Sequence, residues 1–135
     1  MAIGPKVWSE PLIKESNFAI NGRVYLEKCV QKRLIPYIRT HYDDNYVFWQ
    51  DNVSAHYAKV VVEHLELEGT HFFTKEDNPA NIPEARYVEY LWALLKSRDY
   101  VNAWGAKNTH QLTNRIRLWL RQMDAQIVQR LVEST

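Results

Sequence analysis

The sequence is poor in cysteine and in long apolar runs, and each shortage excludes a class of protein. Cys29 is the single cysteine, so an internal disulfide is excluded, and its place in a helical pattern favours a small packed residue over a reactive thiol. No apolar run approaches the roughly 18–20 residues of a membrane helix, and the N-terminus lacks a signal-peptide pattern. We therefore expect an intracellular protein without a membrane partner.

An excess of one charge is also lacking. The net charge is +1, so any attraction to nucleic acid has to come from a local patch and not from the field of the whole protein. The 135 residues are 46% hydrophobic, 13% aromatic and 24% charged, without internal repeats or low-complexity segments. This composition predicts one globular domain, residues 1–135, with a sizeable core.

Apolar residues at helical spacing predict four helices, at residues 22–37, 55–67, 84–98 and 108–132. Their expected terminal signals are Asn21, Ser54 and Pro83 at starts, Gly69 at a stop, and Asn108 with Gln111 as a capping box.

Three segments outside these helices have the composition of strands. Residues 6–15 are an extended candidate, in which Pro11 favours a sheet edge, and residues 70–76 form a second short candidate. The stretch YVFWQ, residues 46–50, is aromatic and β-branched without polar alternation, which is typical of a central strand covered on both faces. The alternation of strands and helices predicts an α/β layer fold, with functional side chains at the carboxyl ends of the strands.

Two acids occupy candidate functional positions. Asp51 directly follows the predicted central strand, where an aspartate also serves simply as a turn or cap residue. Glu89 lies at the border of the apolar face of helix 84–98, and its alternative role is an exposed charge paired with Arg86.

Two longer segments connect these acids to a family. FWQDNVSAH, followed by NPANIPEARYVEYLW, resembles the two signature blocks of Tc1/mariner-type transposases. In those blocks a strand ends in Gln-Asp-Asn with a histidine a few residues later, and the last catalytic acid precedes a tryptophan by three residues. The matching positions here are Gln50, Asp51, Asn52, His56, Glu89 and Trp92. The 37 residues between Asp51 and Glu89, 52–88, fit the spacing of that superfamily.

The resemblance implies a ribonuclease-H-like three-layer fold and metal-dependent DNA strand cleavage and transfer. Two divalent ions, Mg²⁺ or Mn²⁺, activate the attacking oxygen and stabilise the leaving one in such chemistry. Asp51 and Glu89 would be the catalytic metal ligands, with Asn52 and His56 in support. The chain would be the C-terminal part of a catalytic core, with DNA as partner and a nuclear location.

Departures from the family pattern limit this expectation. The family's first catalytic aspartate lies upstream of where this chain starts, and Glu10, Glu15, Asp43 and Asp44 do not replace it convincingly. The first strands and the DNA-end-binding domains are missing as well. We therefore expect weak metal binding if any, no activity of the chain alone, and an open sheet edge that favours a homodimer or pairing with a full-length transposase.

Other side chains carry weaker expectations. His56 is either a hydrogen-bonding neighbour of a metal ligand or a polar residue on a helix surface. Basic residues are densest towards the C-terminus, where, with Tyr100 and Trp104, they form either a track for a DNA backbone or a solvated helix face. These residues are Lys96, Arg98, Lys107, Arg115, Arg117 and Arg121.

Three interpretations stay open from the sequence. The chain is an inactive catalytic-core fragment of a transposase, a noncatalytic domesticated module for DNA binding or dimerisation, or a compact nuclease whose missing carboxylate comes from a partner chain.

Overall fold

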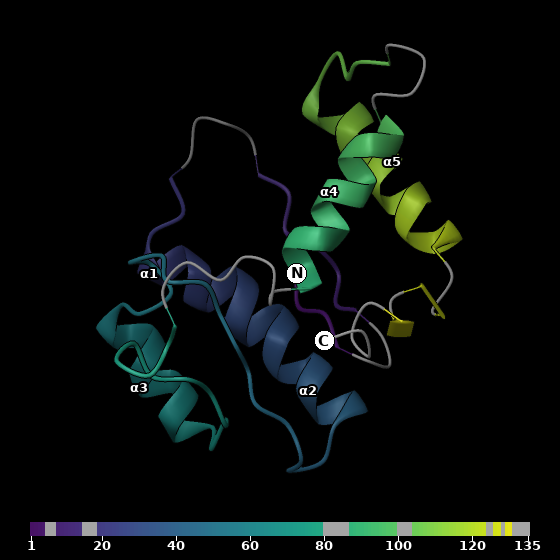
Figure 1. Ribbon diagram of the computed structural model, residues 1–135. Helices are drawn as coiled ribbons and strands as arrows, with labels where there is room; N and C mark the ends of the chain where they lie inside the picture. The colour runs from purple at the N-terminus through teal and green to yellow at the C-terminus, as the bar shows by residue number, and fades with distance from the viewer. Residues whose placement is uncertain are drawn as a thin grey trace. The chain divides into compact units, whose positions relative to one another are not determined.

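Helices dominate the computed structural model, which describes residues 1–4, 8–14, 19–79, 87–99, 104–123, 126–127 and 129–130 (Figure 1). The helices are α1 (Gly22–Val24), the π-helix η1 (Tyr25–Leu34), α2 (Ile35–His41), α3 (Lys59–Leu67), α4 (Tyr87–Asp99) and α5 (Thr109–Gln122). The chain divides into two compact units. The first contains Met1 and Asn17–Asn81, and the second contains Ala2–Ser16 and Ile82–Thr135.

The predicted α/β, ribonuclease-H-like three-layer fold is wrong. In the described ranges, β-pairing is limited to two isolated bridges, Ile3 with Trp8 (antiparallel) and Phe48 with Phe72 (parallel), and neither extends into a sheet. Residues 8–14 of the predicted strand 6–15 are described, and among them only Trp8 takes part in this pairing. The expectation of an open sheet edge, which supported a homodimer, loses its basis for the same reason.

The segment 46–50 shows why the strand prediction failed. Phe48 donates its N–H to the carbonyl of His71 at 2.7 Å and accepts from the N–H of Phe73 at 3.2 Å. Its neighbour Val47 is 60% exposed, so this part of the segment is not covered on both faces. An apolar run indicates burial, but a central strand also needs a partner on each side, and the described residues pair only its Phe48.

The first unit contains one long continuous helix. Its parts α1, η1 and α2 follow one another without a break from residue 22 to 41. Asn21 is its N-cap, as predicted, and its Oδ1 accepts from the N–H of Val24 at 2.9 Å. The helix passes its predicted end at residue 37. The N–H of Ile35 bonds to the carbonyl of Val30, five residues back, which is the π-helical pattern. Pro36 lacks an N–H and cannot donate a helical hydrogen bond. The wider π-helical turns before it are one way in which a helix accommodates a proline.

The helix α3 packs against α1 and η1 within the first unit and buries Val61 and Leu65 completely. Its N-cap is Ala58 and not the predicted Ser54, which lies in the preceding turn. A Cβ on Gly22 would overlap the Cβ of Ala58, so the close approach of α1 to this position requires glycine.

The predicted stop of α3 at Gly69 is confirmed. Gly69 has φ of 67°, the left-handed conformation that favours glycine. Its N–H bonds to the carbonyl of Glu66 at 3.0 Å, and the N–H of Thr70 bonds to that of Leu65 at 2.9 Å. These two bonds are those of a Schellman motif, which satisfies the last carbonyls of the helix.

The second unit contains α4 and α5, which pack against each other. Leu91 and Leu95 of α4 are buried, and so are Ile116 and Leu120 of α5 and its C-cap Met123. Asn108 caps α5 as predicted, accepting from the N–H of Gln111 at 2.9 Å, while Gln111 accepts from the N–H of Lys107 at 3.0 Å.

The helix α5 ends at Gln122 because Met123 is extended, so the expected continuous helix to residue 132 is too long. The predicted helix start at Pro83 lies outside the described residues. None of the helices in the described ranges combines the length and apolar character that a bilayer crossing requires.

Candidate functional site

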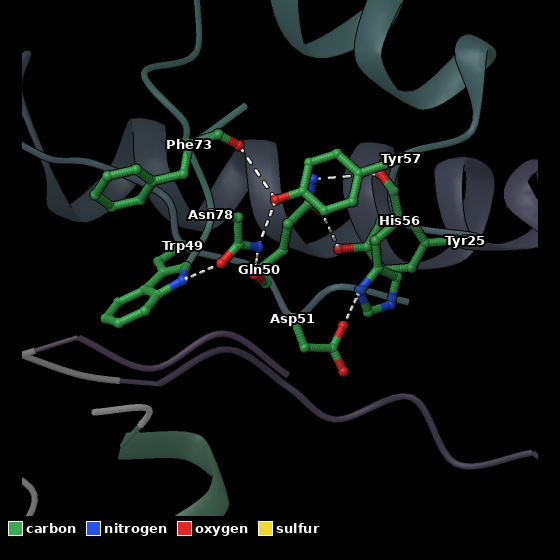
Figure 2. Close-up of polar contacts among 8 residues, drawn as sticks. All are labelled: Tyr25, Trp49, Gln50, Asp51, His56, Tyr57, Phe73 and Asn78. Carbon is green, nitrogen blue, oxygen red and sulfur yellow. Dashed lines mark hydrogen bonds and ion pairs between the residues drawn. The ribbon is translucent and has the colours of Figure 1, made fainter. Parts of the chain in front are cut away.

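Asp51 follows Gln50 in an irregular segment of the first unit, and its carboxylate pairs with the imidazole of His56. Figure 2 shows the two side chains pointing at each other, with Oδ1 of Asp51 facing Nδ1 of His56. The side chains are 33% and 21% exposed, so the pair is partly shielded from water. The contact orients the imidazole, with Nδ1 towards the carboxylate and Nε2 on the other side of the ring.

Tyr25, at the start of η1 in the long helix of residues 22–41, contacts this pair. Its ring stacks on that of His56 with centroids 4.0 Å apart and an interplanar angle of 28°. Its hydroxyl donates to Oε1 of Gln50 at 3.1 Å. Burial, followed by the nearby Cys29, Asp51 and Tyr57, raises the pKa of Tyr25 above its ordinary value, so the hydroxyl stays protonated at alkaline pH values where an exposed tyrosine ionises.

Gln50 holds the start of the motif in place. Its side chain is buried, with 4% of the residue exposed, and donates from Nε2 to the carbonyl of His56 at 3.2 Å. With the bond from Tyr25, the amide connects the long helix to the turn that carries the histidine. Gln50, which precedes Asp51, and the main chain of His56 are therefore held together.

Asn78 is the organising residue that sequence reasoning missed. It is 6% exposed, donates to the carbonyl of Gln50 at 2.8 Å and to the hydroxyl of Tyr57 at 2.7 Å, and accepts from Nε1 of Trp49 at 2.9 Å (Figure 2). The hydroxyl of Tyr57 in turn donates to the carbonyl of Phe73 at 3.3 Å. Asn78 is the first residue of the second sequence block, NPANIPEARYVEYLW. Its place in that block was the one sequence feature that could have indicated its role.

Other described residues of the predicted site have no hydrogen bond in this network. Asn52 is exposed next to Asp51. Glu89 is exposed on α4 in the second unit, with Trp92 half-buried on the same helix, and its proposed partner Arg86 lies outside the described residues. Because Asp51 and Glu89 belong to different units, the predicted short distance between their carboxylates stays a prediction.

The expected pair of Mg²⁺ or Mn²⁺ ions does not fit the donors of the first unit alone. Asp51 and His56 supply one carboxylate and one imidazole, which contact each other, whereas two hard ions are bridged by several carboxylate oxygens. In the described parts of the chain, no three His, Cys, Asp or Glu side chains are grouped to hold a metal ion.

The second unit brings together part of the predicted basic set. The guanidinium of Arg115 lies 4.5 Å from the ring centroid of Trp104 and 5.3 Å from that of Trp119, and Arg98 of α4 lies 5.5 Å from the same Trp119 ring. Such cation–π contacts hold the charge in a defined place. Tyr100, expected beside Trp104, lies outside the described residues.

The remaining cations are exposed. Arg117 and Arg121 are four residues apart on α5 and therefore share one face of the helix. Arg117 also forms an ion pair with Glu10 at 2.8 Å, in which the side chains are 49% and 57% exposed. Lys96 on α4 and Lys107 before α5 are exposed as well. Over its 14 residues α5 carries three arginines and no acid, so it is locally positive in a chain that is nearly neutral.

Comparison with known proteins adds no family to this description. No protein-family model matches the chain, and no curated protein sequence matches it.

Proposed function

We propose that the chain is a transposase-derived piece whose own contribution is sequence-independent binding of DNA through the second unit. The observation that carries this proposal is the arginine-rich, acid-free helix α5, on which Arg98 of α4 and Arg115 of α5 both lie over the ring of Trp119. Phosphate contacts from Arg and Lys supply most of the affinity of non-specific DNA binding. Because the overall charge is +1, this local patch is where such binding arises.

A noncatalytic domesticated module for DNA binding is one of the three interpretations that the sequence leaves open, and this proposal adopts it. It rests on the resemblance of two sequence blocks for its origin, and on the charges of the second unit for its activity. It does not require the ribonuclease-H-like fold, which the described residues do not have. A nuclear location is a further prediction from the same resemblance, whereas self-association and pairing with a full-length transposase lose the open sheet edge that supported them.

The test is binding of a labelled DNA duplex of arbitrary sequence, measured by fluorescence anisotropy. The variant Arg117→Gln/Arg121→Gln replaces the two exposed arginines of α5. It weakens binding about tenfold, since two phosphate contacts are lost. The matched control, Lys28→Gln/Lys32→Gln, removes two exposed charges from η1 in the first unit and leaves the affinity within about twofold. Equal losses in the two variants would contradict the assignment to α5.

A second candidate function, residual DNA strand cleavage, is favoured by the Asp51–His56 pair. A carboxylate that orients an imidazole provides a proton acceptor, and this pair lies in the segment that resembles the Gln-Asp-Asn block. The first unit alone lacks the donors for a metal pair, so we rank cleavage below binding.

A further inference from the structure

An open, shallow groove lies beside α5 in the second unit, and the Asp51 site does not use it. Its volume is about 610 Å³, within the range of about 300–1,000 Å³ found for small-molecule sites. The lining residues are Trp104, Gly105, Lys107, Gln111, Asn114, Arg115 and Leu118. The last four recur at positions i, i+3, i+4 and i+7 of α5, so one face of the helix forms a wall of the groove.

The lining has a distinct chemistry. Lys107 and Arg115 are positive, and none of the described lining residues is acidic, so this part of the groove favours an anion. Trp104 adds a flat aromatic surface, and Leu118, which is 46% exposed, adds an apolar one. The carboxamides of Gln111 and Asn114 add polar atoms to the lining, and both already have partners within the chain, the N–H of Lys107 and the imidazole of His110.

The aromatic surface is ordered before any ligand arrives. Arg115 lies 4.5 Å from the centroid of the Trp104 ring and 5.3 Å from that of Trp119, so the guanidinium connects the indole of the loop to the helix. The amide of Gln111 binds the N–H of Lys107 at 3.0 Å and fixes the backbone of the same loop. A surface that is already in place loses less entropy when it binds a flat ligand.

We propose that this groove binds an unpaired nucleotide of a single-stranded nucleic acid. The base stacks on Trp104 beside Leu118, and Lys107 and Arg115 contact the phosphate. Stacking on an aromatic side chain with a neighbouring cation is how proteins hold single strands without reading their sequence. A duplex cannot use this site in the same way, because its bases are already covered on both faces. The inference rests on the proposed function, since it specifies which form of DNA the second unit prefers.

The experiment uses the full chain in buffer with EDTA, so that metal binding elsewhere plays no part. A labelled oligothymidylate and a duplex of equal length are titrated separately by fluorescence anisotropy. The wild type binds the single strand more tightly. Trp104→Ala lowers single-strand affinity about tenfold, whereas Trp104→Phe keeps most of it because a ring remains.

Lys107→Gln is the second variant, chosen because an exposed side chain is replaced and folding is preserved. It lowers single-strand affinity about threefold or more through the loss of a phosphate contact. The matched control is Lys75→Gln, an exposed lysine in a turn of the first unit, which leaves affinity unchanged. Circular dichroism melting of each variant checks that the fold is retained.

Three results overturn the inference. They are equal losses in Lys107→Gln and Lys75→Gln, duplex binding as tight as single-strand binding, and full affinity in a folded Trp104→Ala. In the last two cases duplex binding that depends on Arg117 and Arg121 leaves the proposed function standing. An absence of binding to either polynucleotide removes both.

Discussion

Asn78 donates its amide to the main-chain carbonyl of Gln50 at 2.8 Å, although 28 residues separate them in sequence. This bond joins the residue before Asp51 to the opening of the second sequence block. The two blocks that support the resemblance are therefore connected in the first unit, even though the fold implied by that resemblance is absent from the described residues.

Asn78→Ala removes three hydrogen bonds from a buried position. It leaves the Gln50 carbonyl and the Trp49 indole N–H without this partner, which we expect to lower the free energy of unfolding by about 2–3 kcal/mol. Urea denaturation followed by circular dichroism measures the change. Asn45→Ala, at an exposed position, is the control with little effect. Equal midpoints for the two variants would show that the network contributes no stability.

Gly22→Ala places a methyl group closer to the Cβ of Ala58 than van der Waals contact allows. We expect a loss of about 1–3 kcal/mol in unfolding free energy, since one of two packed segments has to move. The double variant Gly22→Ala/Ala58→Gly moves the methyl group from one segment to the other and recovers most of the loss, because glycine is tolerated at an N-cap. A double variant as unstable as the sum of the single variants is the contrary outcome.

Tyr25→Phe tests the alkaline stability of the first unit. Burial raises the pKa of Tyr25 above its ordinary value of 10.0, so its contribution is complete below pH 10 and is lost as the pH rises towards the folded value. At neutral pH the variant loses about 1 kcal/mol with the bond to Gln50, and above pH 10 its stability falls less steeply than that of the wild type.

Burial and the hydroxyl of Tyr42 also raise the pKa of Tyr37, so Tyr37→Phe removes a second part of the alkaline loss. Tyr90, which is 61% exposed, provides the control Tyr90→Phe. Thermal melts at several pH values above 9 measure the differences. Parallel pH profiles for Tyr25→Phe and the wild type would contradict the role assigned to burial.

Asp51→Ala tests whether the chain cleaves DNA. We expect no strand cleavage by the wild type with Mg²⁺ or Mn²⁺, because the first unit supplies one carboxylate at this site, and displaced catalytic groups cost about 10²-fold in rate or more. Gel analysis of a labelled duplex is the measurement, with Asp44→Ala at an exposed position as the matched variant. Cleavage by the wild type and Asp44→Ala that disappears in Asp51→Ala would establish the second candidate function.

The residues that were predicted correctly act through local chemistry. Asn21, Gly69 and Asn108 cap or end helices through bonds within a few residues, and such bonds follow from side-chain type. The strand at 46–50 failed because pairing depends on segments distant in sequence, which composition does not supply.

The site was predicted only in part for the same reason. Asp51 and His56 are five residues apart, so a single turn can bring them together. The bonds from Tyr25 and Asn78 to Gln50 span 25 and 28 residues. Neither residue type nor spacing indicates such long-range contacts. The cation–π contacts of Arg115 depend likewise on how the loop at Trp104 returns to α5.

The salt dependence of duplex binding decides whether α5 holds DNA through phosphate contacts. The slope of log K against log salt concentration falls by about 0.9 for each phosphate that the protein neutralises. We predict a clearly negative slope for the wild type and a slope shallower by about 1.8 for Arg117→Gln/Arg121→Gln, with Lys28→Gln/Lys32→Gln unchanged. A slope near zero for the wild type, or one that the arginine replacements leave unaltered, would contradict DNA binding through α5.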